Sequence, residues 1–244
     1  MRKIEVCCSS LAEAREAEAG GAVRIELCAA IACGGVTPSR ALIDMAAEAD
    51  LGLDVNVIIR PREGNFLYTA EEAEIMRRDI AYCREAGVHG VVIGALTPEG
   101  DIDMEMCRRM IDAAGEMSVT FHRAFDVCRT PRRALEQIID LGCDRLLTSG
   151  QQPAAERGAE LIAELVRQAD GRIIVMPGAG IRPSNIADIE RITRAEEFHS
   201  TARSSAPDGM SYRNPDVSFA VEADETIVRR TDRRVVSQLV NDAV

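Results

Sequence analysis

The sequence predicts an α/β protein: a single (β/α)8 barrel of the TIM type with a C-terminal extension, a loop or hairpin followed by a helix. Short β-branched runs alternate with longer amphipathic runs eight times, as parallel βαβ units do. The length of 244 residues suits one such barrel. An open doubly wound sheet is the alternative, but no G-x-G-x-x-G fingerprint follows the first strand. We expect one domain over residues 1–244, with the barrel at about 3–203 and the extension at about 204–244.

The expected strands are short and rich in branched aliphatic residues. They occupy residues 3–8, 23–28, 54–60, 90–94, 118–123, 144–148, 172–177 and 196–200. Parallel strands need long crossover connections, so helices are expected between them. These occupy residues 10–19, 39–49, 70–86, 103–114, 131–141, 155–169 and 184–192.

Start and stop signals support the helices. Thr69 precedes "AEEAEIMRRDIAYCREAG" with Glu72 three residues later, which predicts a capping box, and Gly87 ends the run. Pro131 suits the first turn of another helix. Beyond the last strand, "ARSSAPDGMSYRNPDV" is typical of a loop, residues 217–229 predict an extended hairpin, and "DRRVVSQLVNDAV" predicts a closing helix.

Composition excludes several classes of function. The formal charge is −11 and the basic residues form no block, which disfavours nucleic acid and anionic membranes as partners but allows a local basic pocket. No apolar run approaches the roughly 18 residues of a membrane span, and "MRKIEVCC" has no signal-peptide core. The eight cysteines include no C-x-x-C pair, so a zinc ribbon is not expected. We expect a cytoplasmic protein with free thiols.

Two strands repeat one pattern, aliphatic–glutamate–aliphatic–cysteine, in "IEVC" and "IELC". Alternate side chains of a barrel strand point inward or outward, so the pattern predicts that Glu5 and Cys7 of the first strand point inward. The same parity predicts Glu26 and Cys28 inside the barrel. Inward glutamates are costly unless they are paired. They therefore indicate either a functional site or a layer of salt bridges that only holds the barrel together.

Further polar residues lie at the carboxyl ends of other strands. Arg60 ends "VNVIIR", His122 and Arg123 end "VTFHR", and "EFHS" offers Glu197 and His199. Active sites of these barrels lie at this end, which favours a site over a purely structural layer. His122 is the candidate general base, because neighbouring arginines help to keep its imidazole neutral.

A glycine-containing loop follows the seventh strand in "MPGAGIRPSN". Gly178 and Gly180 would leave backbone N–H groups free just ahead of a helix, which is the usual form of a phosphate site. The alternative is a tight turn that needs glycine for its backbone angles.

The inward cysteines are candidate metal ligands. Neighbouring strands lie about 4.8 Å apart, so Cys7 and Cys28 could hold one ion, and two soft thiolates suit Cu(I). Cys8 points the other way, toward the helices. The alternative is that both inward cysteines are small buried hydrophobes.

Motifs spread over residues 3–203 together resemble the CutC family of copper homeostasis proteins. They are "IEVCCSS", "GGAVRIELC", "GGVTPS", "IRPREGNFLY", "VVIGALTPEGDID", "VTFHRAFD", "LLTSGQ", "MPGAGI" and "EFHS". The resemblance implies a (β/α)8 barrel, a cytoplasmic location, assembly into a homodimer or higher homo-oligomer, and a role in copper handling. It also implies that Cys7 and Cys28 are Cu(I) ligands, since they match the cysteines proposed for that role.

Two hypotheses of function follow. In the first, the chain binds Cu(I) through Cys7 and Cys28, and nearby polar groups tune or gate the site. In the second, it is a lyase, isomerase or hydrolase acting on a small anionic substrate, with phosphorylated and sugar-like compounds as the candidates. Two arginines would clamp the anion, two glycines would hold a phosphate, and the remaining candidates would share acid–base work. The arginines are Arg60 and Arg123, the glycines are Gly178 and Gly180, and the acid–base candidates are Glu5, Glu26 and His122.

Other assignments stay open. The glutamates with His122 would also suit a hard divalent metal. A pure assembly scaffold is a third reading, which the inward charges disfavour. The segment 204–230 is the candidate subunit interface.

Overall fold

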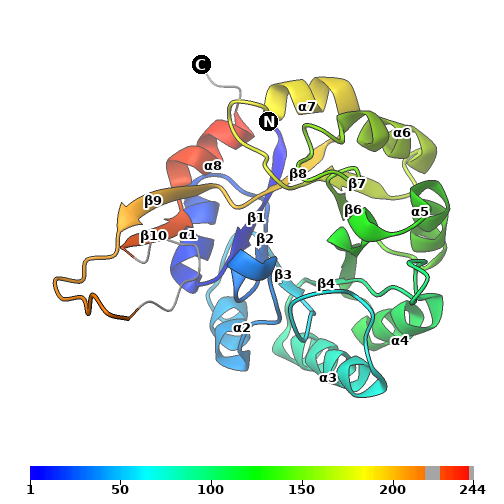
Figure 1. The fold of residues 1–244 in the computed structure, drawn as a ribbon, viewed down its shortest axis with the longest axis horizontal. Helices are drawn as coiled ribbons and strands as arrows, with labels where there is room; N and C mark the ends of the chain where they lie inside the picture. Colours follow the sequence, from blue (N-terminus) through cyan, green and yellow to red (C-terminus); the bar gives the residue numbers. More distant parts are fainter. Residues whose placement is uncertain (218–225, 242–244) are drawn as a thin grey trace.

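The chain forms a barrel of eight parallel strands surrounded by helices (Figure 1), in a computed structural model that describes residues 1–217 and 226–241. The predicted (β/α)8 fold is therefore confirmed. Hydrogen-bonded ladders join the strands in the order β7-β6-β5-β4-β3-β2-β1-β8, and β7 and β8 lie side by side. The strands are β1 (Lys3–Cys8), β2 (Arg24–Leu27), β3 (Asp54–Ile58), β4 (Gly90–Ile93), β5 (Ser118–Phe121), β6 (Arg145–Thr148), β7 (Ile174–Pro177) and β8 (Glu197–Ser200).

Helices cover the outside of the barrel at the predicted places (Figure 1). They are α1 (Leu11–Ala19), α2 (Arg40–Ala47), α3 (Ala70–Ala86), α4 (Met104–Ala114), α5 (Pro131–Asp140), α6 (Ala159–Ala169), α7 (Ile186–Thr193) and α8 (Arg233–Val240). Helix α3 begins with the predicted capping box between Thr69 and Glu72 and ends at Gly87, whose φ is 79°. Two short 3-10 helices, η1 (Ile31–Cys33) and η2 (Arg123–Val127), follow β2 and β5. No helix in the described part of the chain is long and apolar enough to cross a bilayer.

The C-terminal extension differs from the prediction in one element. Strand β9 (Arg203–Pro207) pairs antiparallel with β10 (Ile227–Thr231), so a stretch expected to be loop is strand. Four of the five residues of β9 are exposed, which removes the apolar alternation that would have revealed it. Of the hairpin predicted at 217–229, residues 218–225 lie outside the described residues.

Helix α8 takes the place of the eighth barrel helix, so the hairpin of β9 and β10 is inserted before it (Figure 1). The helix packs on α1 and β1. A Cβ at Gly20, the residue that ends α1, would lie only 2.4 Å from Cβ of Val236. A residue with no side chain is therefore needed where α8 crosses this end of α1.

The predicted strand parity is confirmed by two separate apolar clusters. Ile4, Val6 and Cys8 pack with helix residues in the large cluster outside the barrel. Cys7 and Cys28 belong to a small cluster inside it, with Ile58 and Val92. Most of the core thus lies between strands and helices, and the barrel interior is left for polar residues.

Candidate functional site

A chain of ion pairs fills the interior of the barrel. Arg145 Nε donates to Glu197 Oε2 at 2.9 Å, and Arg24 Nη2 donates to the same oxygen at 2.6 Å. Arg24 Nε in turn donates to Glu5 Oε2 at 2.5 Å. Arg24 and both glutamates are buried. The structural layer considered from the sequence therefore exists, and Glu5 belongs to it.

The chain of charges continues to His199. Its Nδ1 lies 2.7 Å from Glu5 Oε1, and its Nε2 lies 3.9 Å from Glu26 Oε2. Parallel pairing sets this arrangement, because β8 places His199 opposite Glu5 of β1, and β2 places Glu26 opposite Cys7. The imidazole is thus held from one side by a carboxylate and presents its other nitrogen to a second carboxylate and a thiol.

Burial and charge separate the pKa values of these groups. Burial would raise the pKa of Glu5, but hydrogen bonds and charges from His199 and Arg24 lower it to about 2. Burial raises the pKa of Glu26, although the charge of His199 opposes this. Burial would lower the pKa of His199, but hydrogen bonds to Cys7 and Glu5 and the charges of both glutamates raise it well above its ordinary value. These contacts favour the imidazolium form of His199.

The two inward cysteines lie in contact. Cys7 Sγ and Cys28 Sγ are 3.2 Å apart, within the range of a thiol–thiol hydrogen bond. This bond and burial raise the pKa of Cys7 well above its ordinary value. Ligand atoms of Cys7, Glu26 and His199 lie within 4.8 Å of one another, the one group of three metal-ligating side chains found among residues 1–217 and 226–241. Sulfur, imidazole and carboxylate together suit a soft or borderline metal.

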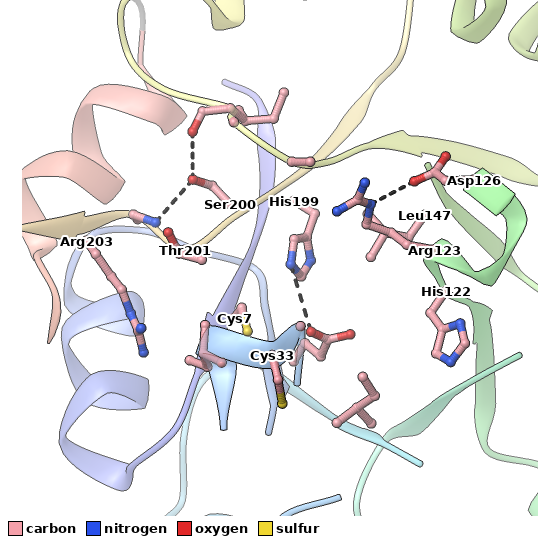
Figure 2. Close-up of a pocket in the computed structure, with 18 of the residues that line it drawn as sticks. Cys7, Cys33, His122, Arg123, Asp126, Leu147, His199, Ser200, Thr201 and Arg203 are labelled. Carbon is pink, nitrogen blue, oxygen red and sulfur yellow. Dashed lines mark hydrogen bonds and ion pairs between the residues drawn. The ribbon is translucent and has the colours of Figure 1, made fainter. Parts of the chain in front are cut away.

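A cavity of about 550 Å³ opens above this group, at the carboxyl ends of the strands. Figure 2 shows His199 directed toward its centre, with Arg123 and Asp126 on one side and Arg203 on the other. The lining includes Cys7, Glu26, Arg60, His122, Arg123 and Gly180 from the predicted set. Glu5, Cys28 and Gly178 are not among the lining residues.

Arg60 is a buried clamp at the wall of the cavity. Its Nη1 donates to the carbonyls of Cys33 and Gly35 at 3.0 and 2.9 Å, and its Nη2 donates to the carbonyl of Gly64 at 2.8 Å. The guanidinium also lies over the ring of Phe66, 5.1 Å from its centroid. Arg60 therefore fixes the loops after β2 and β3, and its Nε has no partner in the described part of the chain.

His122 is buried beside Arg60 and is held in one orientation. Its Nδ1 accepts a hydrogen bond from the Ala124 backbone N–H at 3.2 Å, so the neutral ring carries its proton on Nε2. Burial and the charge of Arg60 lower the pKa of His122 to about 3. A Cβ at Gly94 would lie 2.5 Å from this ring, so glycine is needed there. The geometry favours a hydrogen-bond donor at Nε2 rather than the base expected from the sequence.

Arg123 stands at the rim and is paired with the loop after β6. Its Nε donates to Asp126 Oδ2 at 2.7 Å and its Nη2 donates to Ser149 Oγ at 3.0 Å. Asp126 also accepts hydrogen bonds from the Thr148 hydroxyl and from the backbone N–H groups of Ser149 and Gln151. Asp126 thus fixes two loops, and Arg123 keeps part of its guanidinium exposed to the cavity.

The glycine loop has separate roles for its two glycines. The N–H of Gly178 donates to the Thr148 carbonyl at 2.9 Å, so it serves the sheet. A Cβ there would meet Leu147 Cδ1 at 2.5 Å, which makes this glycine a packing requirement. Gly180 has a φ of 74° and lines the cavity with Arg182, which the sequence analysis did not single out.

Arg24 was missed, although the sequence held a signal for it. Arg24 precedes Glu26 by two residues, so strand parity alone places it inside the barrel. His199 was noted on the last strand, but its place opposite Glu5 depends on β8 closing against β1. Asp126 lies in the motif "VTFHRAFD" after the fifth strand, and its role in the loop after β6 was not predicted.

Comparison with known proteins identifies a family. The model of the CutC family matches residues 2–204. A CutC family protein from Parabacteroides distasonis is 54% identical over 241 residues, which are 98% of this chain and 99% of that protein. Another from Bacteroides fragilis is 50% identical over 215 residues, 88% of this chain and 86% of that protein.

Solved structures agree on the fold. A protein from Streptococcus agalactiae, provisionally named copper homeostasis protein CutC, superimposes with a TM-score of 0.79 at 32% identity, covering 82% of this chain and 99% of that one. Phosphoribosylanthranilate isomerase from Thermotoga maritima superimposes with a TM-score of 0.58 at 12% identity, covering 99% of this chain and 98% of that one, and shares the fold alone.

Proposed function

We propose, from the premise that this chain belongs to the CutC family, that it binds Cu(I) through Cys7 and Cys28 inside the barrel and serves copper homeostasis in the cytoplasm. The observation that carries this proposal is the separation of 3.2 Å between the two sulfur atoms. The name of the related structure from Streptococcus agalactiae supports the same role. Two buried thiols in contact form a soft ligand pair that suits Cu(I).

Binding requires a small movement of one cysteine. With metal–sulfur bonds of about 2.3 Å, a linear site spans about 4.6 Å between sulfurs, more than the distance found. Cys28 is fully buried and does not line the cavity, so its side chain has little room to move. Cys7 borders the cavity and is the side chain that would turn.

His199 is the proposed third participant. Glu5 holds Nδ1, so Nε2 is directed at the metal position beside Cys7. A carboxylate that fixes the far nitrogen of a ligating imidazole is a common second partner at metal sites. Because Cys7 and His199 both hold protons when metal-free, Cu(I) must displace them, and affinity should rise with pH.

The test is an anaerobic titration of Cu(I) against a chromophoric chelator. Wild type should bind one ion per chain, and Cys7→Ser/Cys28→Ser should lose that ion. The matched control is Cys83→Ser/Cys107→Ser, which removes two buried cysteines from helices α3 and α4. Equal binding by wild type and the Cys7/Cys28 variant, or equal loss in both double variants, contradicts the proposal.

The cavity favours a second candidate function, a barrel enzyme of lyase, isomerase or hydrolase type acting on a small anionic substrate. Four arginines line it, at 60, 123, 182 and 203, although the whole chain carries a formal charge of −11. Glu26 lines the same space as an acid–base group, and His122 lines it as a neutral hydrogen-bond donor. Turnover of an anionic substrate that is lost in Glu26→Gln would support this candidate, and unchanged turnover in that variant would contradict it.

Self-association is proposed through the hairpin of β9 and β10. Met210, Tyr212, Val217 and Ile227 gather large exposed apolar side chains in and beside it. Light scattering after size exclusion should give a homodimer or larger for wild type and a smaller particle for Met210→Ser/Tyr212→Ser. The control Met45→Ser/Ile75→Ser removes two other exposed apolar side chains, from α2 and α3. An unchanged mass in the hairpin variant contradicts this interface.

A further inference from the structure

Buried polar atoms without protein partners border the cavity. His122 is 4% exposed, and its Nε2 has no hydrogen-bond partner among residues 1–217 and 226–241. Arg60 is 5% exposed, and its Nε is equally unsatisfied there. An unsatisfied buried donor costs about 1–3 kcal/mol. Such a group calls for an explanation. Arg60 has the Tyr68 side chain beside it, whereas the Nε2 donor of His122, a residue that lines the cavity, points to a ligand there.

The rim of the cavity adds a cation without a counter-ion. The exposed guanidinium of Arg182 forms no ion pair or hydrogen bond with any described residue, whereas Arg123 and Arg203 are paired with Asp126 and Glu13. Its Nη2 lies 4.0 Å from the position that a Cβ at Gly180 would occupy, so it extends over that glycine. Positive charge is thus concentrated at one opening of an acidic protein, which attracts small anions.

We propose that the cavity binds a small phosphate monoester. Its phosphate lies at the rim on Arg182 and the Gly180 loop, next to Arg123, and an uncharged oxygen deeper in the ligand accepts a hydrogen bond from His122 Nε2. This site does not depend on copper. A phosphate monoester belongs to the class of small anionic substrates that the second candidate function requires, so this proposal deepens that function. The proposal concerns binding alone and does not require that a reaction follows.

The shape and charge of the cavity select this class of ligand. A volume of about 550 Å³ lies in the usual range of small-molecule sites. Ile58, Phe66, Leu147 and Ile181 provide apolar walls for a carbon skeleton. Deep in the cavity the carboxyl group of Glu26 disfavours a second anion, so the group that meets His122 is a hydroxyl or carbonyl. The phosphate stays at the rim, where three arginines lie and part of its hydration is kept.

The imidazole of His122 is suited to this role. Its low pKa, about 3, keeps it neutral at physiological pH, and the bond from the Ala124 N–H keeps its proton on Nε2. It therefore donates to a neutral oxygen without adding charge. A neutral imidazole that polarises a carbonyl is a known device of barrel enzymes.

Nuclear magnetic resonance of the full-length protein labelled with ¹⁵N-histidine tests the site. The chain has three histidines, so the signals are readily assigned. The probes are glycerol 3-phosphate, glycerol and lactate. Glycerol 3-phosphate should shift the Nε2–H signal of His122 to saturation and leave exposed His89 unmoved, while glycerol should shift neither. A His122 signal that no probe moves overturns the proposal, and stronger binding of lactate overturns the assignment to phosphate.

Matched variants locate the anion. Arg182→Gln should weaken binding of glycerol 3-phosphate about tenfold, the loss expected for one charge-assisted contact. Arg157→Gln removes an exposed arginine outside the cavity and controls for the change in net charge. Equal weakening in the two variants overturns the placement at Arg182. Cys7→Ser/Cys28→Ser should bind the probe as wild type does, so failure of the copper proposal and failure of this one are separate results.

Discussion

His122 predicts how the stability of this protein changes with pH. Burial, and then the charge of Arg60, lower its pKa from 6.5 to about 3. In the unfolded chain the imidazole takes up a proton as the pH falls through 6.5, whereas the folded protein does not until about 3. The unfolded state therefore binds more protons across this window. The contribution of His122 to the free energy of unfolding is fully present above pH 6.5, the pKa of the imidazole in the unfolded chain. It is lost as the pH falls toward about 3, the pKa in the folded protein.

The size of the effect follows from the two pKa values. Each pH unit within the window costs about 1.4 kcal/mol. Between about pH 7 and about pH 4.5, His122 should lower the free energy of unfolding by about 2.5 kcal/mol. The assay is urea unfolding of wild type and His122→Gln at both pH values. Acidic groups such as Glu5 titrate in both proteins, so the difference between the two pH-induced losses isolates His122.

His89→Gln is the control, because it removes an exposed histidine instead of a buried one. The loss of unfolding free energy on acidification should be larger for wild type than for His122→Gln by about 2.5 kcal/mol. Equal losses in wild type and His122→Gln would refute the reasoning. They would mean that His122 takes up its proton in the folded protein as readily as in the unfolded chain, and the neutral donor at Nε2 would then fail too.

Three further predictions concern single residues. Arg24→Met should destabilise the fold by about 3–5 kcal/mol in urea unfolding, because it removes the cation that two buried glutamates share; a loss below about 1 kcal/mol would show that water reaches them. Gly94→Ala should cost about 1–3 kcal/mol and shift the His122 resonance, since its Cβ would overlap that ring; an unmoved resonance would contradict the overlap. Asp126→Ala should cost about 2–4 kcal/mol and speed amide exchange in the loop after β6, and unchanged exchange there would deny Asp126 its role in that loop.

Much of the fold could be predicted from the sequence because its signals are local. Strand and helix periodicity, the capping box at Thr69 and the parity of Glu5 and Cys7 all depend on neighbours within a few residues. Strand β9 could not be predicted in this way. Its residues Arg203–Pro207 are mostly exposed, and only pairing with a segment about 20 residues later makes them a strand.

The site was predictable in part for the same reason. Parity placed Cys7 and Cys28 inside the barrel, but their contact at 3.2 Å depends on the stagger between β1 and β2, which pairs Cys7 with Glu26 and places Cys28 beyond it. The position of His199 opposite Glu5 could not be predicted, because it depends on the pairing of β8 with β1, and no local sequence pattern indicates that pairing. The hydrogen bonds of Arg60 could not be predicted, because they depend on where three loop carbonyls lie in space, which a sequence does not show.

The charged residues inside the barrel could serve only to hold the barrel together, or they could also form part of a ligand site. They alternate in sign along one path, from Arg145 to Glu197, Arg24, Glu5 and His199. A chain that served packing alone could end on a neutral side chain and leave no charge beside the cavity. This one ends on an imidazole whose far nitrogen faces a thiol and a second carboxylate across open space. The inner part of the path is therefore structural, and its last residue is where we propose that a ligand replaces a proton.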